Sequence, residues 1–389
     1  MSELRVLQII KGLDIGGLNG GAERFSVDLS RQLKILGCRV DLCAFYRTHT
    51  PIEKDWLTKV SDIGIDIFFA TAWGGPNNLS CLIDGFKALR LLVKNREYDI
   101  LHSHFQQGTF TALWLKRKLN GTVVMRTAHN VVEWEPGFLG KVKEAISDFI
   151  YPRCLDAEVG VSETIVEQLS RRYPDHIKKQ RPALVFNGII LPPNEVSLPS
   201  DTTKKNKFTI GTAGRLAEQK GYVYLLAAIS VVLQRHPEAE LVLLGDGELR
   251  SELEAQTRQL GIESHVEFVG QVSNVLERLK KFDLFVSSSL WEGLPTVIME
   301  AMAVGLPVVA TDIPGTREMI YDGENGCLVS PGDPFSLANA IIKMIEAPLL
   351  RQKFGDAGKQ SLKLYRVEEI AKDYLRLYET LLRKYRSTV

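Results

Sequence analysis

Two carboxylates lie close together in the stretch WEGLPTVIMEAMAVGLPVVATDIPG, which spans residues 291–315. Glu292 stands directly before a Gly-Leu-Pro sequence, and Glu300 lies within an apolar run that predicts a helix over about 295–304. Two neighbouring acids can serve as nucleophile and general acid in glycoside hydrolysis. The predicted helix separates this pair, because Glu292 lies in the loop before it and Glu300 lies roughly one and a half turns inside it.

The start of this predicted helix is suited to bind an anion. Pro295 favours the first helical position and Gly305 the far end. The first backbone N–H groups, those of Thr296 and Val297, have no acceptor within the helix and can bind a phosphate. Because side chains on a helix lean toward its N-terminus, Glu300 can reach a ligand held there. We interpret Glu300 as an acceptor for ligand hydroxyls, and the alternative is a carboxylate exposed on a partly buried helix.

Two cations follow a predicted strand in GTAGRLAEQKGYVYLL, residues 211–226. Arg215 comes after the strand, and Lys220 precedes the glycine that opens the next helix. At the carboxyl edge of a parallel sheet, the forked guanidinium and the compact ammonium together suit a diphosphate. The alternative is that both side chains are simply solvated.

Glycines follow two other predicted strands. The loop LDIGGLNGGAERF, residues 13–25, includes Gly20 and Gly21 and could bring its backbone close to a phosphate. Its spacing departs from GxGxxG, which disfavours a nicotinamide-type dinucleotide site. The alternative is a flexible turn in which Glu23 caps the following helix. The Gly-Asp-Gly sequence at 245–247 predicts a tight turn, because Arg250 occupies the third glycine position.

Three histidines, His102, His104 and His129, lie at the ends of neighbouring predicted strands, and their roles stay open between structure and function. No acidic residues stand at helical spacing to complete a metal site, so we expect no metal. Ser162 lies in no GxSxG sequence, which argues against a hydrolase.

The elements that must position these residues alternate as strand and helix. This alternation predicts parallel sheets with helices on both faces. It stops in the Pro- and Ser-rich stretch 191–207 and then begins again, which predicts two doubly wound domains with ligands at the carboxyl ends of the strands and between the domains. We predict strands at 4–10, from 39, 98–104, 122–130, 158–162, 183–188, 208–214, 239–245, 265–270, 282–287 and 307–311, and helices at 23–36, 79–96, 221–235 and 367–386.

The composition is that of a globular protein: 389 residues suit two domains, with 45% hydrophobic and 24% charged residues. A net charge of +1 argues against a dedicated nucleic-acid binder. The five cysteines form no CxxC, and no signal peptide or transmembrane run is evident, so we expect a cytoplasmic protein. The basic stretches 115–121 and 171–181 are expected to be solvated, with a peripheral contact to the inner membrane surface as the alternative.

Taken together, these motifs resemble the retaining glycosyltransferases of family four, especially bacterial polysaccharide-building members. The resemblance runs through GGAER, HSH, TAHN, VGVSE, VFNGI, GRLAEQKG, GDGELR and EGLPTVIMEAMAVGLPVVAT, with EGLP where many members have EGFG. It implies the α/β fold called GT-B, with two Rossmann-like domains facing each other across a cleft. The expected parts are an acceptor domain at 1–188, a donor domain at 189–366 and a helix at 367–389 that returns to the first domain.

The resemblance also implies roles for individual residues. Arg215 and Lys220 match the cations on the donor diphosphate, Glu300 the acid on the ribose, and Glu292 the acid on the transferred sugar. His129 matches the histidine near the reacting face of the sugar. The remaining donor-binding positions are Gly20, Gly21, Gly293, Leu294, Pro295, Thr296 and Val297.

The function implied by the resemblance is transfer of a hexose from a nucleotide sugar to a hydroxyl of a glycan or lipid-linked acceptor. Transfer is expected to retain the anomeric configuration and to need neither metal nor cofactor. UDP-glucose is the preferred donor, while GDP-mannose, UDP-galactose and UDP-N-acetylglucosamine stay open. The alternatives are a nucleotide-sugar 2-epimerase, or an inactive scaffold subunit of a polysaccharide assembly complex. The acceptor, the linkage and the oligomeric state are not predicted.

Overall fold

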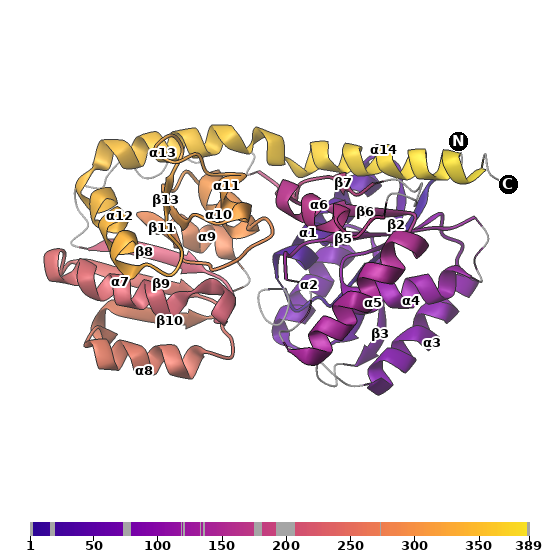
Figure 1. The fold of residues 1–389 in the computed structure, drawn as a ribbon, viewed down its shortest axis with the longest axis horizontal. Helices are drawn as coiled ribbons and strands as arrows, with labels where there is room; N and C mark the ends of the chain where they lie inside the picture. Colours follow the sequence, from indigo (N-terminus) through magenta and orange to yellow (C-terminus); the bar gives the residue numbers. More distant parts are fainter. Residues whose placement is uncertain are drawn as a thin grey trace. The chain divides into compact units, whose positions relative to one another are not determined.

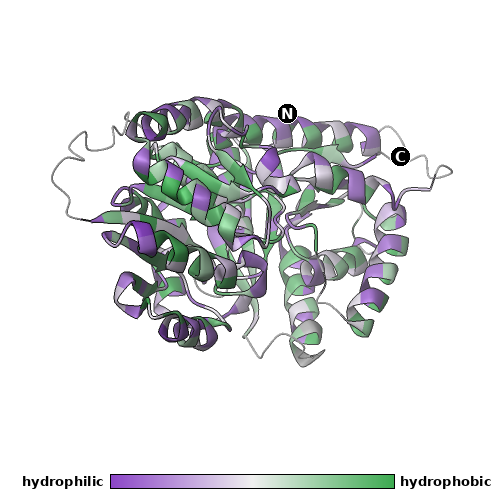
Figure 2. Ribbon diagram, turned by 60° about the vertical axis from the view of Figure 1, so that its left-hand side comes forward, coloured by the Kyte–Doolittle hydropathy of each residue, from purple (hydrophilic) through white to green (hydrophobic). Residues whose placement is uncertain are grey.

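The protein divides into two compact units, one of Met1–Gly188 with Val367–Val389 and the other of Ile189–Arg366 (Figure 1). In each unit, helices cover a central parallel sheet, and Figure 2 shows the strands mostly hydrophobic and the helices banded. Most of the expected linker at 191–207 lies outside the described residues. The computed structural model describes residues 3–15, 20–72, 79–117, 119, 121–132, 134, 137–174, 181–191, 207–272 and 274–386.

The first unit contains a seven-stranded parallel sheet with the order β3-β2-β1-β4-β5-β6-β7. Residues of β4, β5 and β6 are buried on both faces, as the near-continuous apolar runs of a parallel sheet require. The order reverses between β1 and β4, so ligands are expected at the carboxyl ends of these two strands. The strands are β1 (Arg5–Ile10), β2 (Arg39–Arg47), β3 (Asp66–Ala72), β4 (Ile100–Ser103), β5 (Val123–Ala128), β6 (Ala157–Gly160) and β7 (Ala183–Leu184).

Helices cover both faces of this sheet. Alternation along β1 sends Ile10 to the core shared with α1 and α2, and Leu7 to the core shared with α3, α4 and α5. The helices are α1 (Gly21–Ile35), α2 (Pro51–Asp62), α3 (Leu79–Asn95), α4 (Gln106–Lys116), α5 (Phe138–Cys154), α6 (Glu163–Ser170) and α14 (Val367–Arg386).

The last helix, α14, packs within the first unit beside α1, where the rings of Phe25 and Tyr374 lie 6.1 Å apart. Its buried positions repeat every three or four residues, and none of them is a charged residue. The buried Tyr378 hydroxyl accepts a hydrogen bond from Gln8 of β1 and lies 2.8 Å from His102 of β4. The apolar stripe predicted for 367–386 is therefore used in packing against the beginning of the chain.

The second unit contains a six-stranded parallel sheet with the order β10-β9-β8-β11-β12-β13, so its switch point lies between β8 and β11. The strands are β8 (Phe208–Ala213), β9 (Ala239–Leu244), β10 (Val266–Gly270), β11 (Leu284–Ser287), β12 (Val308–Thr311) and β13 (Cys327–Val329). The helices are α7 (Tyr222–Arg235), α8 (Arg250–Leu260), α9 (Val275–Leu279), α10 (Thr296–Ala303), α11 (Pro314–Arg317), α12 (Pro334–Glu346) and α13 (Pro348–Ser361), with 3-10 turns at Glu218–Lys220, Glu263–His265 and Leu362–Tyr365.

The middle of β8 packs closely against the ring of Phe282, because a Cβ atom added at Gly211 would overlap that ring. A glycine at this position lets the strand and the ring share the space. We predict that Gly211→Ala lowers the free energy of unfolding by about 1–3 kcal/mol, the usual cost of overpacking a core. Urea denaturation of the whole chain measures the loss.

The loss of stability in Gly211→Ala should come from the contact with the Phe282 ring alone. Combining Gly211→Ala with Phe282→Leu, which replaces the ring by a smaller side chain, should therefore give less than the sum of the two single losses. Additive losses would show that the alanine is opposed by something other than Phe282.

Candidate functional site

Lys220 and Glu292 form an ion pair at the switch point of the second unit. Lys220 ends the 3-10 turn after β8, and Glu292 lies in the loop after β11. Lys220 Nζ is 2.5 Å from Glu292 Oε1, and the two side chains are only 18% and 7% exposed. Ser289 donates a hydrogen bond to the same oxygen at 2.8 Å, and Gln219 donates to Oε2 at 3.2 Å. The carboxylate is thus held by three partners.

Backbone contacts between the two loops bring these side chains together. The Leu290 N–H donates to the Gln219 carbonyl at 2.7 Å, and the Ser288 hydroxyl donates to the Lys220 carbonyl at 2.8 Å. Gly221 follows with φ +60°, and a Cβ atom there would overlap the Ser288 carbonyl oxygen. Glycine is therefore needed at this crossing for both conformation and space.

Arg215 lies on the loop after β8, with its side chain 55% exposed and an Nη2 3.6 Å from Glu248 Oε1. The loop contacts the Gly-Asp-Gly segment that follows β9. The Leu216 N–H donates to the Asp246 carbonyl at 3.0 Å, and a Cβ atom at Gly247 would lie 2.5 Å from the Leu216 carbonyl oxygen. The turn predicted for 245–247 lies just after it, at Glu248 and Leu249, where the Arg250 N–H donates to the Gly247 carbonyl at 3.2 Å.

Helix α10 begins beside Glu292. Its first residue is Thr296, and no side chain caps the helix. Pro295 is the N-cap, whereas the sequence predicted it as the first helical residue. The prediction failed because Pro295 adopts an extended backbone with ψ 102°. Its first N–H groups, those of Thr296 and Val297, have no acceptors within the helix. The interpretation of the 295–304 run as a helix is confirmed.

Glu300 is the fifth residue of α10, lies among buried side chains and is 5% exposed. The alternative of an exposed carboxylate at this position is therefore wrong. The residues between the two acids, Gly293, Leu294 and Pro295, are buried as well. A Cβ atom on Gly315 of α11 would lie 2.5 Å from the Gly293 carbonyl oxygen, so α11 closes over this segment.

These features share one edge of the second sheet, because β8 and β11 are neighbours and both end there. The edge carries an ammonium, a guanidinium and an uncapped helix N-terminus, all of which stabilise an anion. The Lys220 ammonium is paired with Glu292 at this edge. An anion that binds Lys220 must therefore compete with the Glu292 carboxylate for the ammonium, or share the ammonium with it.

In the first unit the three histidines do come together. His102 lies 2.8 Å from both the Tyr378 hydroxyl and the Thr127 hydroxyl. His104 Nε2 lies 2.7 Å from Gln8 Oε1, and His104 Nδ1 lies 3.0 Å from His129 Nε2. An amide oxygen only accepts, so His104 carries its proton on Nε2 and accepts at Nδ1. His129 then carries its proton on Nε2, which leaves Nδ1 as its acceptor nitrogen.

Burial keeps this cluster uncharged. It lowers the pKa of His102 to about 3, and His129 adds to the effect. Burial likewise lowers the pKa of His129 to about 3. The charge of Arg126 also lowers this pKa, whereas a hydrogen bond with Asn187 raises it. The pKa of His104 is held well below its ordinary value by burial and by its two histidine neighbours. His102 and His104 are thus neutral and hydrogen-bonded within the unit, and His129 is at the end of their chain.

Gly20 and Gly21 lie at the start of α1. Gly20 is the N-cap, and its N–H donates to Glu23 Oε2 at 3.0 Å, so Glu23 does cap the helix. Burial raises the pKa of Glu23, against the effect of this hydrogen bond. A Cβ atom at Gly20 would meet nothing within 4 Å. Residues 16–19 of the same loop lie outside the described residues, and the predicted contact with a phosphate stays a prediction.

The structure groups the predicted residues by unit. Arg215, Lys220, Glu292 and the start of α10 share the edge of the second sheet, whereas Gly20, Gly21 and His129 belong to the first. Gln219 and Ser289, which hold Glu292, were missed, because ordinary polar loop residues carry no sequence signal of their partners. Over the described parts of the chain, no group of three or more His, Cys, Asp or Glu side chains could hold a metal ion. Nor is any helix in those parts long and apolar enough to cross a membrane.

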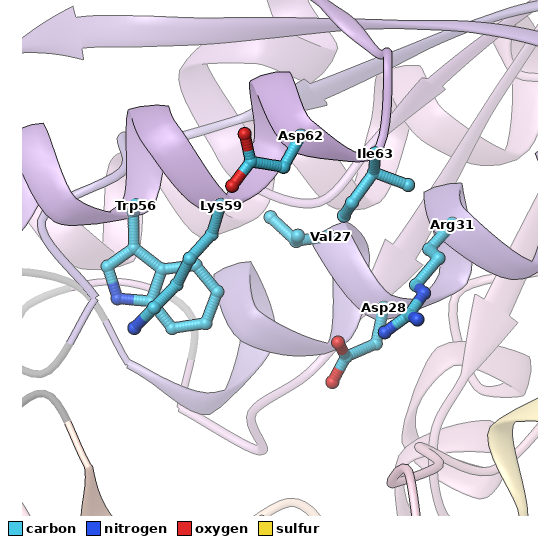
Figure 3. A pocket seen from close by; sticks show the side chains of 7 residues that line it. All are labelled: Val27, Asp28, Arg31, Trp56, Lys59, Asp62 and Ile63. Atoms are coloured by element: carbon cyan, nitrogen blue, oxygen red, sulfur yellow. The ribbon is translucent and has the colours of Figure 1, made fainter.

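A separate hollow lies between α1 and α2 and contains none of the predicted site residues (Figure 3). The Trp56 indole N–H donates to the Ile15 carbonyl at 3.0 Å, and the Lys59 ammonium lies 4.8 Å from the centre of the Trp56 ring. Its polar groups thus serve the packing of α2. The lining residues are Val27, Asp28, Arg31, Trp56, Lys59, Asp62 and Ile63.

The buried histidines predict a pH dependence of stability. His102 and His129 stay neutral in the folded protein down to about pH 3, whereas unfolded histidine takes up a proton near its ordinary pKa of 6.5. Stability should therefore be unaffected by them above that pH and fall below it, by up to about 1.4 kcal/mol per pH unit for each histidine. Denaturation followed by tryptophan fluorescence reports this, since four of the five tryptophans lie in residues 1–188.

The test variant is His129→Asn, which removes one titrating group. The free energy of unfolding of this variant should fall less steeply as the pH is lowered. The matched control is His49→Asn, because His49 is exposed in the same unit and should leave the slope unchanged. If the free energy of unfolding fell equally steeply with pH in the two variants, the histidine cluster would not be neutral in the folded protein.

Two family models match the chain in succession. The model described as Glycosyltransferase Family 4 matches residues 19–191, and the model described as Glycosyl transferases group 1 matches residues 195–361. An uncharacterized glycosyltransferase of Methanocaldococcus jannaschii is 33% identical over 205 residues, which is 45% of this chain and 50% of that one.

Two further matches cover most of the chain. The UDP-Gal:alpha-D-GlcNAc-diphosphoundecaprenol alpha-1,3-galactosyltransferase of Escherichia coli is 25% identical over 77% of this chain and 79% of its own length. The crystal structure of Anabaena HepE in complex with UDP-glucose superimposes with a TM-score of 0.78, covering 97% of this chain and 100% of that one at 21% identity. The chain therefore has the GT-B fold and belongs to family four of the glycosyltransferases, the enzymes that transfer sugars.

Proposed function

We propose that the protein transfers a hexose, glucose from UDP-glucose, to a hydroxyl of a glycan or lipid-linked acceptor in polysaccharide or glycolipid biosynthesis, with retention at the anomeric carbon. The observation that carries the proposal is the Lys220–Glu292 ion pair at the switch point, beside the N-terminus of α10. A nucleotide sugar has the two groups that such a pair can bind: a diphosphate for the cation and sugar hydroxyls for the carboxylate.

The choice of donor is supported by two similar proteins. The name of the Escherichia coli relative specifies UDP-Gal, and the Anabaena structure was solved with UDP-glucose. Both names contain the same uridine diphosphate, which supports UDP more firmly than it supports either hexose. The Escherichia coli name also specifies a diphosphoundecaprenol-linked acceptor, which supports a lipid-linked acceptor for this chain.

The proposed donor site follows from the geometry of the second unit. Lys220 and Arg215 would bind the diphosphate, and the N–H groups of Thr296 and Val297 would add the positive end of the α10 dipole. Lys220 would be shared between the phosphates and Glu292. Ser289 and Gln219 keep Glu292 in place during this exchange, which leaves the carboxylate able to accept hydrogen bonds from the sugar.

The same proposal gives roles to the remaining predicted site residues. Buried Glu300, reaching back along α10, would accept hydrogen bonds from the ribose hydroxyls. The amides of Gly20 and Gly21 would approach the β-phosphate, and neutral His129 would lie near the reacting face of the sugar. The cations stabilise the charge of the leaving diphosphate in place of a metal, and a phosphate oxygen takes the proton of the acceptor hydroxyl.

Donor recognition can be tested before any acceptor is known. We predict that UDP-glucose raises the thermal midpoint of the protein more than GDP-mannose, UDP-galactose or UDP-N-acetylglucosamine at equal concentration. A ligand that binds only the folded state stabilises it, by about 2.7 kcal/mol at a concentration of 100 Kd. A larger shift with GDP-mannose would refute the uridine donor, and no shift with any of the four would favour an inactive scaffold.

Turnover should depend on the Lys220 ammonium. We predict that Lys220→Ala reduces acceptor-dependent release of UDP by at least about a hundredfold, the usual effect of losing one donor of charge stabilisation. The thermal midpoint of the variant is measured as well, because loss of the ammonium leaves the buried Glu292 carboxylate with only Ser289 and Gln219 as partners.

The matched control is Lys280→Ala, which removes a lysine of the same unit that pairs with Glu277 on an exposed helix. Its turnover should equal that of the unmodified protein. Near-normal transfer by Lys220→Ala would refute the assignment, and UDP-sugar conversion without any acceptor would point to the epimerase.

A further inference from the structure

The two oxygens of the Glu292 carboxylate have unequal surroundings. Oε1 has two partners, the Lys220 ammonium at 2.5 Å and the Ser289 hydroxyl at 2.8 Å. Among the described residues, the one partner of Oε2 is the Gln219 amide, at the longer distance of 3.2 Å. A carboxylate has about four acceptor positions, two on each oxygen. Those on Oε1 are filled, so a ligand hydroxyl finds its acceptor position on Oε2, beside Gln219.

The open side of this carboxylate is the side of Gln219. Ser289 is 2% exposed, so Oε1 faces the interior of the unit, whereas Gln219 is half-buried on the 3-10 turn after β8. Gln219 also directly precedes Lys220, the cation proposed to bind the diphosphate. A sugar attached to that diphosphate would therefore meet the Gln219 side of the carboxylate first.

The orientation of the Gln219 amide follows from its two partners. Its nitrogen lies 2.9 Å from the Trp291 carbonyl oxygen and 3.2 Å from Glu292 Oε2. Both partners are oxygens that only accept, so the amide nitrogen and not the amide oxygen must face them. Its two N–H groups are then both used, and no described residue donates to Gln219 Oε1. The amide is thus held by both of its hydrogens with its own acceptor free.

Gln219 Oε1 and Glu292 Oε2 form a pair of neighbouring acceptors, because one N–H···O hydrogen bond joins their side chains. The backbone fixes this pair, since the Leu290 N–H donates to the Gln219 carbonyl at 2.7 Å and so ties the turn to the loop of Glu292. Neither acceptor offers a proton, so the pair suits a ligand with two donors side by side. Hydroxyls on adjacent carbons of a sugar ring are such donors.

We propose that Gln219 is a specificity-determining residue for the sugar donor, and that its amide oxygen accepts a hydrogen bond from the ring hydroxyl next to the one bound by Glu292. This role rests on the proposed function, because it requires a nucleotide sugar whose diphosphate is bound by Lys220. The class of sugar selected is a hexose with two free hydroxyls on adjacent carbons, since a missing hydroxyl leaves one acceptor unpaired. In a hexose ring linked through C1, these pairs are C2 with C3 and C3 with C4. Either Gln219 or Glu292 must therefore bind the C3 hydroxyl.

Calorimetric binding of UDP and of UDP-glucose to the whole protein is the experiment. The variant Gln219→Met has a side chain of similar length without the amide. It should bind UDP with an unchanged Kd, which shows that the site is folded. It should bind UDP-glucose about threefold to tenfold more weakly, the usual effect of one neutral hydrogen bond. The variant Glu292→Gln should weaken UDP-glucose by more than about tenfold, because it replaces a charged acceptor by a neutral one.

Donors that lack one hydroxyl separate a direct contact from positioning. Analogues of UDP-glucose deoxygenated at C2, C3 or C4 are bound to each variant, which gives a cycle between one side chain and one hydroxyl. The loss caused by Gln219→Met should vanish with one of the three analogues. The loss caused by Glu292→Gln should shrink with an analogue altered at the adjacent carbon, and one of these two analogues must be the one altered at C3.

The matched control is Ser289→Ala, which removes a partner of Glu292 Oε1 at a position too buried to touch a sugar. Its loss should depend on the hydroxyl bound by Glu292 and not on the hydroxyl bound by Gln219. Coupling of Gln219→Met to no hydroxyl, or to the same hydroxyl as Ser289→Ala, would overturn the proposal, since Gln219 would then act only by holding Glu292.

Failure of the proposed function gives a different result. If the unmodified protein does not bind UDP-glucose, the proposed donor is refuted and the role of Gln219 falls with it. If UDP-glucose binds and the coupling alone is missing, the donor stands and only the role of Gln219 is overturned.

Discussion

The ion pair of Lys220 and Glu292 is the interaction on which the candidate site depends. A carboxylate only 7% exposed is costly unless its oxygens are matched, and here an ammonium, a hydroxyl and an amide match them. The match requires the loops after β8 and β11 to touch, which Gly221 permits. The same pairing keeps the ammonium in a defined place where it can meet an incoming anion.

The first unit depends on a comparable constraint, but its polar cluster is neutral. The chain from Gln8 through His104 to His129 is satisfied only if each histidine holds one proton on a particular nitrogen. Tyr378 and Tyr374 of α14 complete it through His102 and Thr127. Helix α14, the last twenty residues of the described chain, therefore helps to orient the side chains of this cluster, which starts at Gln8. This explains why α14 is a buried part of the unit and not an appended tail.

The sequence predicted much of the fold because its signals are local. The apolar runs of β1, β4, β5 and β8 and the amphipathic periods of α7 and α14 follow from alternation and spacing alone. Glu292 and Glu300 could likewise be separated into loop and helix. Gln219 and Ser289 could not be predicted, since their importance comes from contacts between loops some seventy residues apart. The position of Pro295 was missed by one residue, which is within the ordinary uncertainty of helix ends.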